Sequence, residues 1–144
     1  MSGYVVDASV AVKWLVDEPF SDEAARLLDD GIALVAPELV YVESANALWA
    51  MHRRGDIGLS DFTEALSVLK AAPVAVPASM RQLAAPAGRL AVDLGHPVYD
   101  CVYLALALQE QCPVVTADPR LYDVVRAHPY LSDRILHLKD LPER

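Results

Sequence analysis

Two aspartates, Asp7 and Asp118, occupy equivalent places in the sequence, each just after a short apolar segment that is typical of a buried strand. Those segments are residues 3–6 and 113–116. In open α/β sheets ligands bind outside the carboxyl ends of the strands, so two such acids can face each other across a crevice. An aspartate after a strand is also a routine helix N-cap, and the position of either residue alone leaves both interpretations open.

Two further acids, Glu43 and Asp100, lie in helical segments that are apolar on nearly every side, residues 37–54 and 99–111. This pattern predicts that both helices are buried. A buried carboxylate without a partner is costly and is normally paired or bound to a metal. No Lys or Arg lies within one helical turn of either acid. The alternative is that each acid lies on the single solvent-exposed stripe of its helix.

Four carboxylates in one pocket would repel one another and raise each other's pKa, unless divalent cations neutralise them. Oxygen ligands of this kind suit Mg²⁺ or Mn²⁺. Such an ion can activate a water for attack on phosphorus and neutralise charge on the phosphoryl oxygens. The chain has a net charge of −8, which should repel a nucleic-acid backbone. Bound metal answers that objection because it converts an acidic pocket into a phosphate acceptor. We therefore expect a small metal-dependent nuclease.

Three polar residues stand close to these acids in sequence. Ser9 and Thr116 are each two residues from an aspartate, and Asn46 is one turn after Glu43. Ser9 and Thr116 could orient a carboxylate or a metal-bound water, but capping of a helix start explains them equally well. Asn46 could donate to Glu43 or to a phosphate.

Basic residues near the predicted site are few. The candidates for contact with a phosphate backbone are Lys13, Arg53, Arg54 and Arg120. Arg120 is the best placed because it follows Asp118 by two residues. Neither a Ser-His-Asp arrangement nor a Gly-rich phosphate loop is present. The histidines have no metal-ligand spacing: His52, His96, His128 and His137.

The elements that would position these side chains alternate between short apolar strands and helices. Strands are expected at residues 3–6, 33–35, 74–76, 113–116 and 134–138. Helices are expected at residues 8–16, 21–30, 37–54, 60–71, 79–94, 99–111 and 119–127, with Pro86 kinking or splitting the fifth. This order predicts an α/β fold, a three-layer sandwich around a central parallel sheet that is buried on both faces.

The length of 144 residues and the lack of a linker predict one domain over residues 1–144. Hydrophobic residues make up 54%, but no apolar run reaches the roughly 18 residues that span a bilayer. The first residues have neither the basic nor the apolar region of a signal peptide. We expect a cytoplasmic protein with no membrane association.

Several segments, in order and spacing, resemble the PIN-domain family and specifically the VapC toxins of bacterial VapBC toxin–antitoxin modules. Each segment alone is unspecific, but all four acids in order, with Ser9 and Thr116 beside them, are quite specific. The segments cover essentially the whole chain and lie at residues 5–9, 37–39, 42–48, 96–100, 103–107 and 115–118.

The resemblance implies a Mg²⁺- or Mn²⁺-dependent endoribonuclease that hydrolyses RNA phosphodiester bonds as the toxin of a toxin–antitoxin pair. It also implies a homodimer and a cognate antitoxin protein that blocks the site. By the same match the metal ligands and catalytic residues are Asp7, Glu43, Asp100 and Asp118. Some family members carry a further acid where this chain has Arg120. The resemblance therefore supports one metal position more firmly than a second.

Two other functional classes are compatible with parts of the pattern. A non-catalytic PIN-like binding or scaffold module should have lost one or more of the four acids, and all four are present. A receiver-type phosphate-handling domain needs paired acids after the first strand and a late lysine after a strand. Asp7 is followed by Ala8 and Ser9, and no strand is followed by such a lysine.

Overall fold

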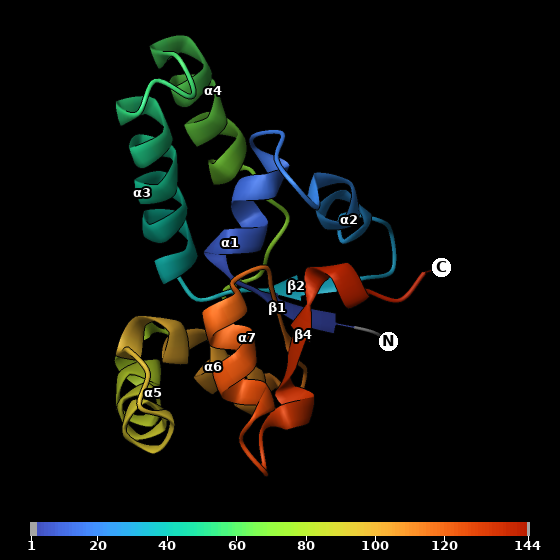
Figure 1. Cartoon of the computed structure of the whole chain (residues 1–144), viewed down its shortest axis with the longest axis vertical. Helices are drawn as coiled ribbons and strands as arrows, with labels where there is room; N and C mark the ends of the chain where they lie inside the picture. The colour runs from blue at the N-terminus through green and yellow to red at the C-terminus, as the bar shows by residue number, and fades with distance from the viewer. Residues whose placement is uncertain (1–2, 144) are drawn as a thin grey trace.

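A four-stranded parallel sheet lies at the centre of residues 3–143, the part of the chain that the computed structural model describes (Figure 1). The strand order is β2-β1-β3-β4, so the first strand is central. Val5 of β1 pairs with Val35 of β2 and with Val114 of β3. The strands are β1 (Gly3–Val6), β2 (Ala33–Val35), β3 (Val114–Thr116) and β4 (Ile135–His137).

Helices cover both faces of this sheet. The α-helices are α1 (Ala8–Ala11), α2 (Ser21–Arg26), α3 (Leu39–Arg53), α4 (Leu59–Lys70), α5 (Met80–Leu94), α6 (Val98–Glu110) and α7 (Pro119–Arg126). Short 3₁₀ helices are η1 (Val12–Trp14), η2 (Ser132–Arg134) and η3 (Leu138–Asp140). In Figure 1, α1 to α4 lie on one side of the sheet and α5 to α7 on the other. The predicted α/β sandwich with a central parallel sheet is confirmed.

The two central strands are apolar because both of their faces are covered. Val5, Val6, Val114 and Val115 have no exposed surface. Helix α6 packs beside them and is buried along seven consecutive residues, from Cys101 to Ala107. The prediction that the helix carrying Asp100 is buried is therefore confirmed.

The prediction that the helix carrying Glu43 is buried nearly all round is wrong. Helix α3 is buried only at Val40, Ser44 and Leu48, while Val42 is 69% exposed and Trp49 is 48% exposed. The reason is its position, since α3 forms a hairpin with α4 that extends away from the sheet (Figure 1). Helix α3 packs mainly against α4, α1 and η1.

The strand predicted at residues 74–76 is reduced to a single parallel bridge between Ala75 and Val35. Ala75 donates to the Leu34 carbonyl and accepts from the Ala36 amide, so it lies against the edge strand β2. Pro73 and Pro77 flank it, and proline has no amide hydrogen with which to extend the pairing.

Two predicted helices are shorter than expected. The helix predicted over residues 8–16 becomes α1, which ends at Ala11, followed by the 3₁₀ helix η1. The helix predicted over residues 21–30 ends at Arg26 and gives way to turns before Gly31, whose φ is +87°. Its N-cap is Phe20, whose φ of 70° lies in the left-handed region. Helix α5 runs from Met80 to Leu94 as one helix, so Pro86 does not split it. Among the helices of residues 3–143, none is long and apolar enough to cross a membrane.

Candidate active site

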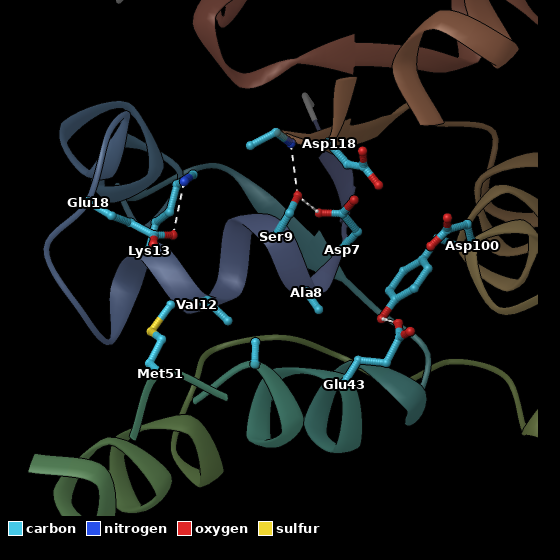
Figure 2. Close-up of a pocket in the computed structure, with 13 residues that line it drawn as sticks. Asp7, Ala8, Ser9, Val12, Lys13, Glu18, Glu43, Met51, Asp100 and Asp118 are labelled. Carbon is cyan, nitrogen blue, oxygen red and sulfur yellow. Dashed lines mark hydrogen bonds and ion pairs between the residues drawn. The ribbon is translucent and has the colours of Figure 1, made fainter. Parts of the chain in front are cut away.

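An open cavity of about 350 Å³ lies at the carboxyl ends of β1 and β3 (Figure 2). All four acids that the sequence singled out line it, and they come from four different elements. Asp7 and Asp118 follow β1 and β3, Glu43 is on α3, and Asp100 is on α6. The fold thus brings together residues that are as much as 111 positions apart in the sequence, 118 − 7.

Asp7 is the most firmly held of the four. Its Oδ1 accepts hydrogen bonds from the Ser9 hydroxyl at 2.6 Å and from the Val10 amide at 3.2 Å, and its Oδ2 accepts from the Thr116 hydroxyl. Only 5% of the residue is exposed. Burial raises the pKa of Asp7 to about 6, against the opposing effect of the hydrogen bonds and with a smaller contribution from Asp100. Asp7 is both the N-cap of α1 and a wall of the cavity, so both sequence interpretations hold at once.

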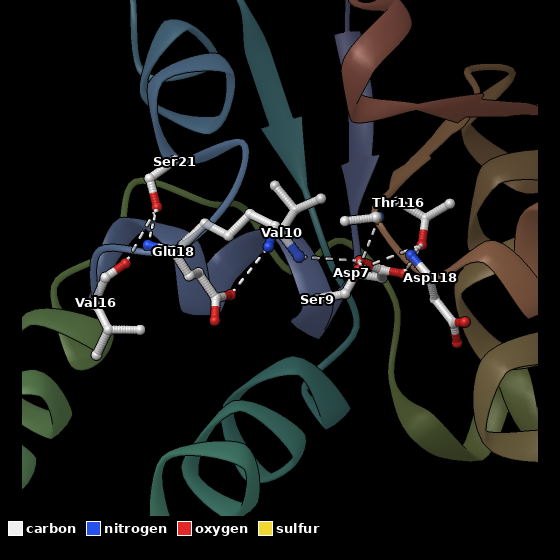
Figure 3. A network of polar contacts seen from close by, with 10 residues as sticks. Asp7, Ser9, Val10, Val16, Glu18, Ser21, Thr116 and Asp118 are labelled. Atoms are coloured by element: carbon white, nitrogen blue, oxygen red, sulfur yellow. Dashed lines mark hydrogen bonds and ion pairs between the residues drawn. The ribbon is translucent and has the colours of Figure 1, made fainter. Parts of the chain in front are cut away.

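Ser9 and Thr116 connect the two strand ends rather than cap a helix (Figure 3). The Ser9 hydroxyl accepts from the Ala117 amide at 2.9 Å and lies 3.3 Å from the Thr116 hydroxyl. Thr116, which is fully buried, accepts from the Asp118 amide at 3.0 Å. The helix caps are the acids themselves, and the two hydroxyls fix the loops that carry them.

Asp118 caps α7, because its Oδ1 accepts from the Arg120 amide at 2.9 Å. Its side chain is 29% exposed. The Arg120 side chain is 89% exposed, and its Nε lies 4.0 Å from the same carboxylate. Arg120 therefore projects into solvent at the margin of the site and does not line the cavity.

Glu43 accepts a hydrogen bond of 2.6 Å from the hydroxyl of Tyr103 on α6. Burial raises the pKa of Glu43, and the negative charge of Asp100 adds to that effect. Asn46 is exposed and lies outside the lining of the cavity. Sequence reasoning missed Tyr103, although it follows Asp100 by three residues and so had to share its face of the helix.

Asp100 also has a partner that sequence reasoning missed. Nε2 of His96 lies 2.6 Å from its Oδ2, and the His96 side chain is 11% exposed. The sequence has no Lys or Arg within one helical turn of Asp100, but His96 precedes it by four residues, a spacing that indicates a contact. The two acids borne by helices are thus held by an imidazole and a phenol rather than left unpaired.

Lys13 lines the side of the cavity away from Glu43 and Asp100 (Figure 2). Its Nζ lies 3.0 Å from Oε1 of Glu18, and its side chain is 10% exposed. Glu18 lines the same cavity, so the lining contains five acids and one lysine. The cavity therefore concentrates negative charge, and the lysine within it is already paired.

The donor types fit a hard divalent ion, because every acid offers carboxylate oxygen. Burial and the negative charge of Asp100 raise the pKa of Asp7 and of Glu43, and a bound cation would favour the ionised form of both carboxylates. As placed, however, no three His, Cys, Asp or Glu side chains within residues 3–143 are close enough to hold one ion together.

Comparison with known proteins agrees with this geometry. The PIN domain family model matches residues 4–127. Ribonuclease VapC3 from Pyrobaculum aerophilum is 33% identical over 121 residues, which cover 81% of this chain and 90% of that protein.

Two solved structures share the fold. PAE2754 from Pyrobaculum aerophilum has a TM-score of 0.65 at 22% identity and covers 97% of this chain and 92% of its own. VapBC-1 from nontypeable Haemophilus influenzae has a TM-score of 0.60 at 17% identity and covers 95% and 98%.

The family model spans most of the chain, and the relative of 33% identity spans most of both chains. The cavity with its four acids lies within the matched residues. This chain therefore belongs to the PIN-domain family and is of the VapC type.

Proposed function

We propose that this protein is a divalent-metal-dependent endoribonuclease that acts as the toxin of a toxin–antitoxin pair. The observation that carries the proposal is the convergence of Asp7, Glu43, Asp100 and Asp118 on one cavity at the carboxyl ends of the strands. The relative named as a ribonuclease supports RNA as the substrate.

In this proposal the four acids would hold Mg²⁺ or Mn²⁺, and the ion would supply an activated water and neutralise charge on the phosphoryl oxygens. Asp7 has the most fixed position because it accepts three hydrogen bonds from its surroundings. Asp118 and Asp100 are about one-third exposed at their side chains and so can reach an incoming phosphodiester. Ser9 and Thr116 keep the two aspartate loops at a fixed separation.

Lys13 is the candidate for contact with an RNA phosphate inside the cavity, and Arg120 is the candidate at its margin. A phosphate that approached Lys13 would compete with Glu18 for the ammonium group. Both residues carry a positive charge, which is scarce around this acidic cavity. RNA binding depends on positive charges because they neutralise phosphates of the backbone.

The partners in this proposal are a cognate antitoxin protein and a second copy of the chain in a homodimer, acting in the cytoplasm. The likeness in fold to VapBC-1 supports the antitoxin. Light scattering of the purified chain tests the dimer, and co-purification with the product of the neighbouring gene tests the antitoxin.

One observation favours the second candidate, a non-catalytic PIN-like scaffold. The acids line the cavity without being gathered at the spacing of metal ligands, as far as the described residues show. Against it, a module with no reaction to perform has no reason to keep four mutually repelling carboxylates at one cavity. Catalysis therefore remains the leading proposal.

RNA ends mapped after induction in cells test the proposal. The comparison is between wild type, Asp100→Asn and Asp93→Asn, which removes the same charge from an exposed residue of α5. New RNA ends should appear with wild type and with Asp93→Asn, and disappear with Asp100→Asn. If the same ends persist in Asp100→Asn, the acidic cavity is not the nuclease site.

A further inference from the structure

Tyr103 is the side chain that joins the two helix-borne acids of the cavity. Its ring is part of the core, since only 1% of the residue is exposed, yet it lines the cavity. Its hydroxyl donates to Oε1 of Glu43 at 2.6 Å (Figure 2). Tyr103 also follows Asp100 by one helical turn on α6. The buried Tyr103 side chain thus lies on the same helix as Asp100 and forms a hydrogen bond with Glu43.

Glu43 needs such a contact more than the two strand-end aspartates do. Asp7 is held by donors from α1 and from β3, and Asp118 is held by the first turn of α7. Glu43 instead lies on α3, whose outer face is exposed and which extends away from the sheet with α4. The Tyr103 hydroxyl comes from the most buried helix of the fold. Its hydrogen bond therefore fixes the position of the Glu43 carboxylate relative to the core.

We infer that Tyr103 is a positioning residue for the metal-dependent step, acting through Glu43. This inference rests on the proposed function. The hydroxyl limits the rotamers of the Glu43 side chain and holds one carboxylate oxygen at a fixed place beside Asp100. Partners that orient metal ligands in this way typically change metal affinity or activity 10–100-fold when they are removed.

Tyr103→Phe isolates this role because it removes one oxygen atom and keeps the ring that fills the core. We expect a melting temperature in EDTA close to that of wild type. We expect the single-turnover cleavage rate to fall about 10–100-fold, and the Mg²⁺ concentration for half-maximal rate to rise. Tyr122→Phe is the matched control, since it removes the same atom from a half-buried tyrosine of α7 outside the cavity. It should leave both quantities unchanged.

A double-mutant cycle shows whether Tyr103 acts through Glu43. Single-turnover rates are compared for Glu43→Ala, Tyr103→Phe and the double variant. If Tyr103 acts by positioning Glu43, adding Tyr103→Phe to Glu43→Ala has no further effect. A further loss equal to that of Tyr103→Phe alone would overturn the inference, because Tyr103 would then act independently of Glu43.

A second readout separates this inference from the proposed function. The increase in melting temperature on titration with Mn²⁺ reports metal binding without cleavage. Tyr103→Phe should show a smaller increase at each Mn²⁺ concentration than wild type. If wild type cleaves RNA and Tyr103→Phe matches it in rate and Mn²⁺ response, the inference alone fails. If wild type neither cleaves nor responds to Mn²⁺, the proposed function and the inference fail together.

Discussion

The hydroxyl of Thr116, the last residue of β3, donates a hydrogen bond to Oδ2 of Asp7, the residue that follows β1. Both residues are buried, at 0% and 5% exposure. The same hydroxyl oxygen accepts from the Asp118 amide. The Thr116 hydroxyl oxygen therefore contacts both strand-end acids. It stabilises the fold and sets the separation of Asp7 and Asp118 in the cavity.

Thr116→Val should remove this link while nearly preserving the side-chain volume. We expect the free energy of unfolding to fall by about 1–3 kcal/mol, because a buried carboxylate loses a donor. Urea unfolding in EDTA measures the change. The control is Thr63→Val, whose exposed hydroxyl donates only to a carbonyl one turn back on α4. Equal losses in the free energy of unfolding for the two substitutions would show that the hydrogen bond to Asp7 contributes no more to stability than an exposed one.

Asp7 should make the metal-free protein less stable as the pH rises. Its pKa is raised by burial from 3.8 to about 6, so between these values the folded state keeps a proton that the unfolded chain has released. The stabilisation is complete below pH 3.8 and is lost as the pH rises to about 6. Its size is roughly 3 kcal/mol for a shift of about two pKa units.

Asp7→Asn tests this because the amide can still cap α1 and has no charge to bury. In EDTA at pH 7 the variant should be more stable than wild type, and the difference should shrink toward pH 4. Millimolar Mg²⁺ should stabilise wild type and have little effect on the variant. Equal stability of the two proteins from pH 4 to pH 7 would contradict the account of Asp7.

His96→Ala should impair cleavage because Asp100 loses the imidazole that lies 2.6 Å from its Oδ2. We expect a loss of about 10-fold or more in rate at saturating RNA. His128→Ala serves as the control, since His128 is a histidine outside the cavity that accepts a hydrogen bond from the Tyr130 amide. The assignment of His96 as the partner that orients Asp100 fails if the two variants cleave RNA at the same rate.

Lys13→Ala should weaken RNA binding in a way that depends on salt. The slope of log affinity against log salt concentration should become less negative by about 0.7, the value for one contact with a single-stranded phosphate. Filter binding in EDTA, which prevents cleavage, gives this slope. Lys70→Ala removes an exposed charge on α4 and should leave the slope unchanged. An unchanged slope in Lys13→Ala would show that Lys13 does not contact an RNA phosphate.

Local patterns were sufficient to locate the four strands of the sheet, although they also predicted a fifth at residues 74–76. The strands at residues 3–6 and 33–35 were predicted correctly, because a short apolar run bounded by turn residues is typical of a strand that is buried on both faces. The position of Asp7 and Asp118 at strand ends followed directly from those strands. All four acids line one cavity. Their role as metal ligands stays a prediction.

What the sequence could not supply depends on contacts between distant residues. Tyr103 and Glu43 are 60 positions apart, and no local pattern joins them. The exposure of α3 follows from its place beyond the sheet, which apolar composition cannot reveal. Ala75 forms one bridge instead of a strand because neighbouring prolines limit its pairing. His96 is different, since its spacing from Asp100 was visible in the sequence.

The most direct test is cleavage of a single-stranded RNA by the purified protein in Mg²⁺ and in EDTA. Wild type and Asp93→Asn should cleave in Mg²⁺ and stop in EDTA. The single substitutions Asp7→Asn, Glu43→Gln, Asp100→Asn and Asp118→Asn should each lower the rate by at least about 100-fold, because each removes the charge of a proposed metal ligand. Cleavage that continues in EDTA, or that survives these substitutions at the wild-type rate, would contradict a metal-dependent site built from the four acids.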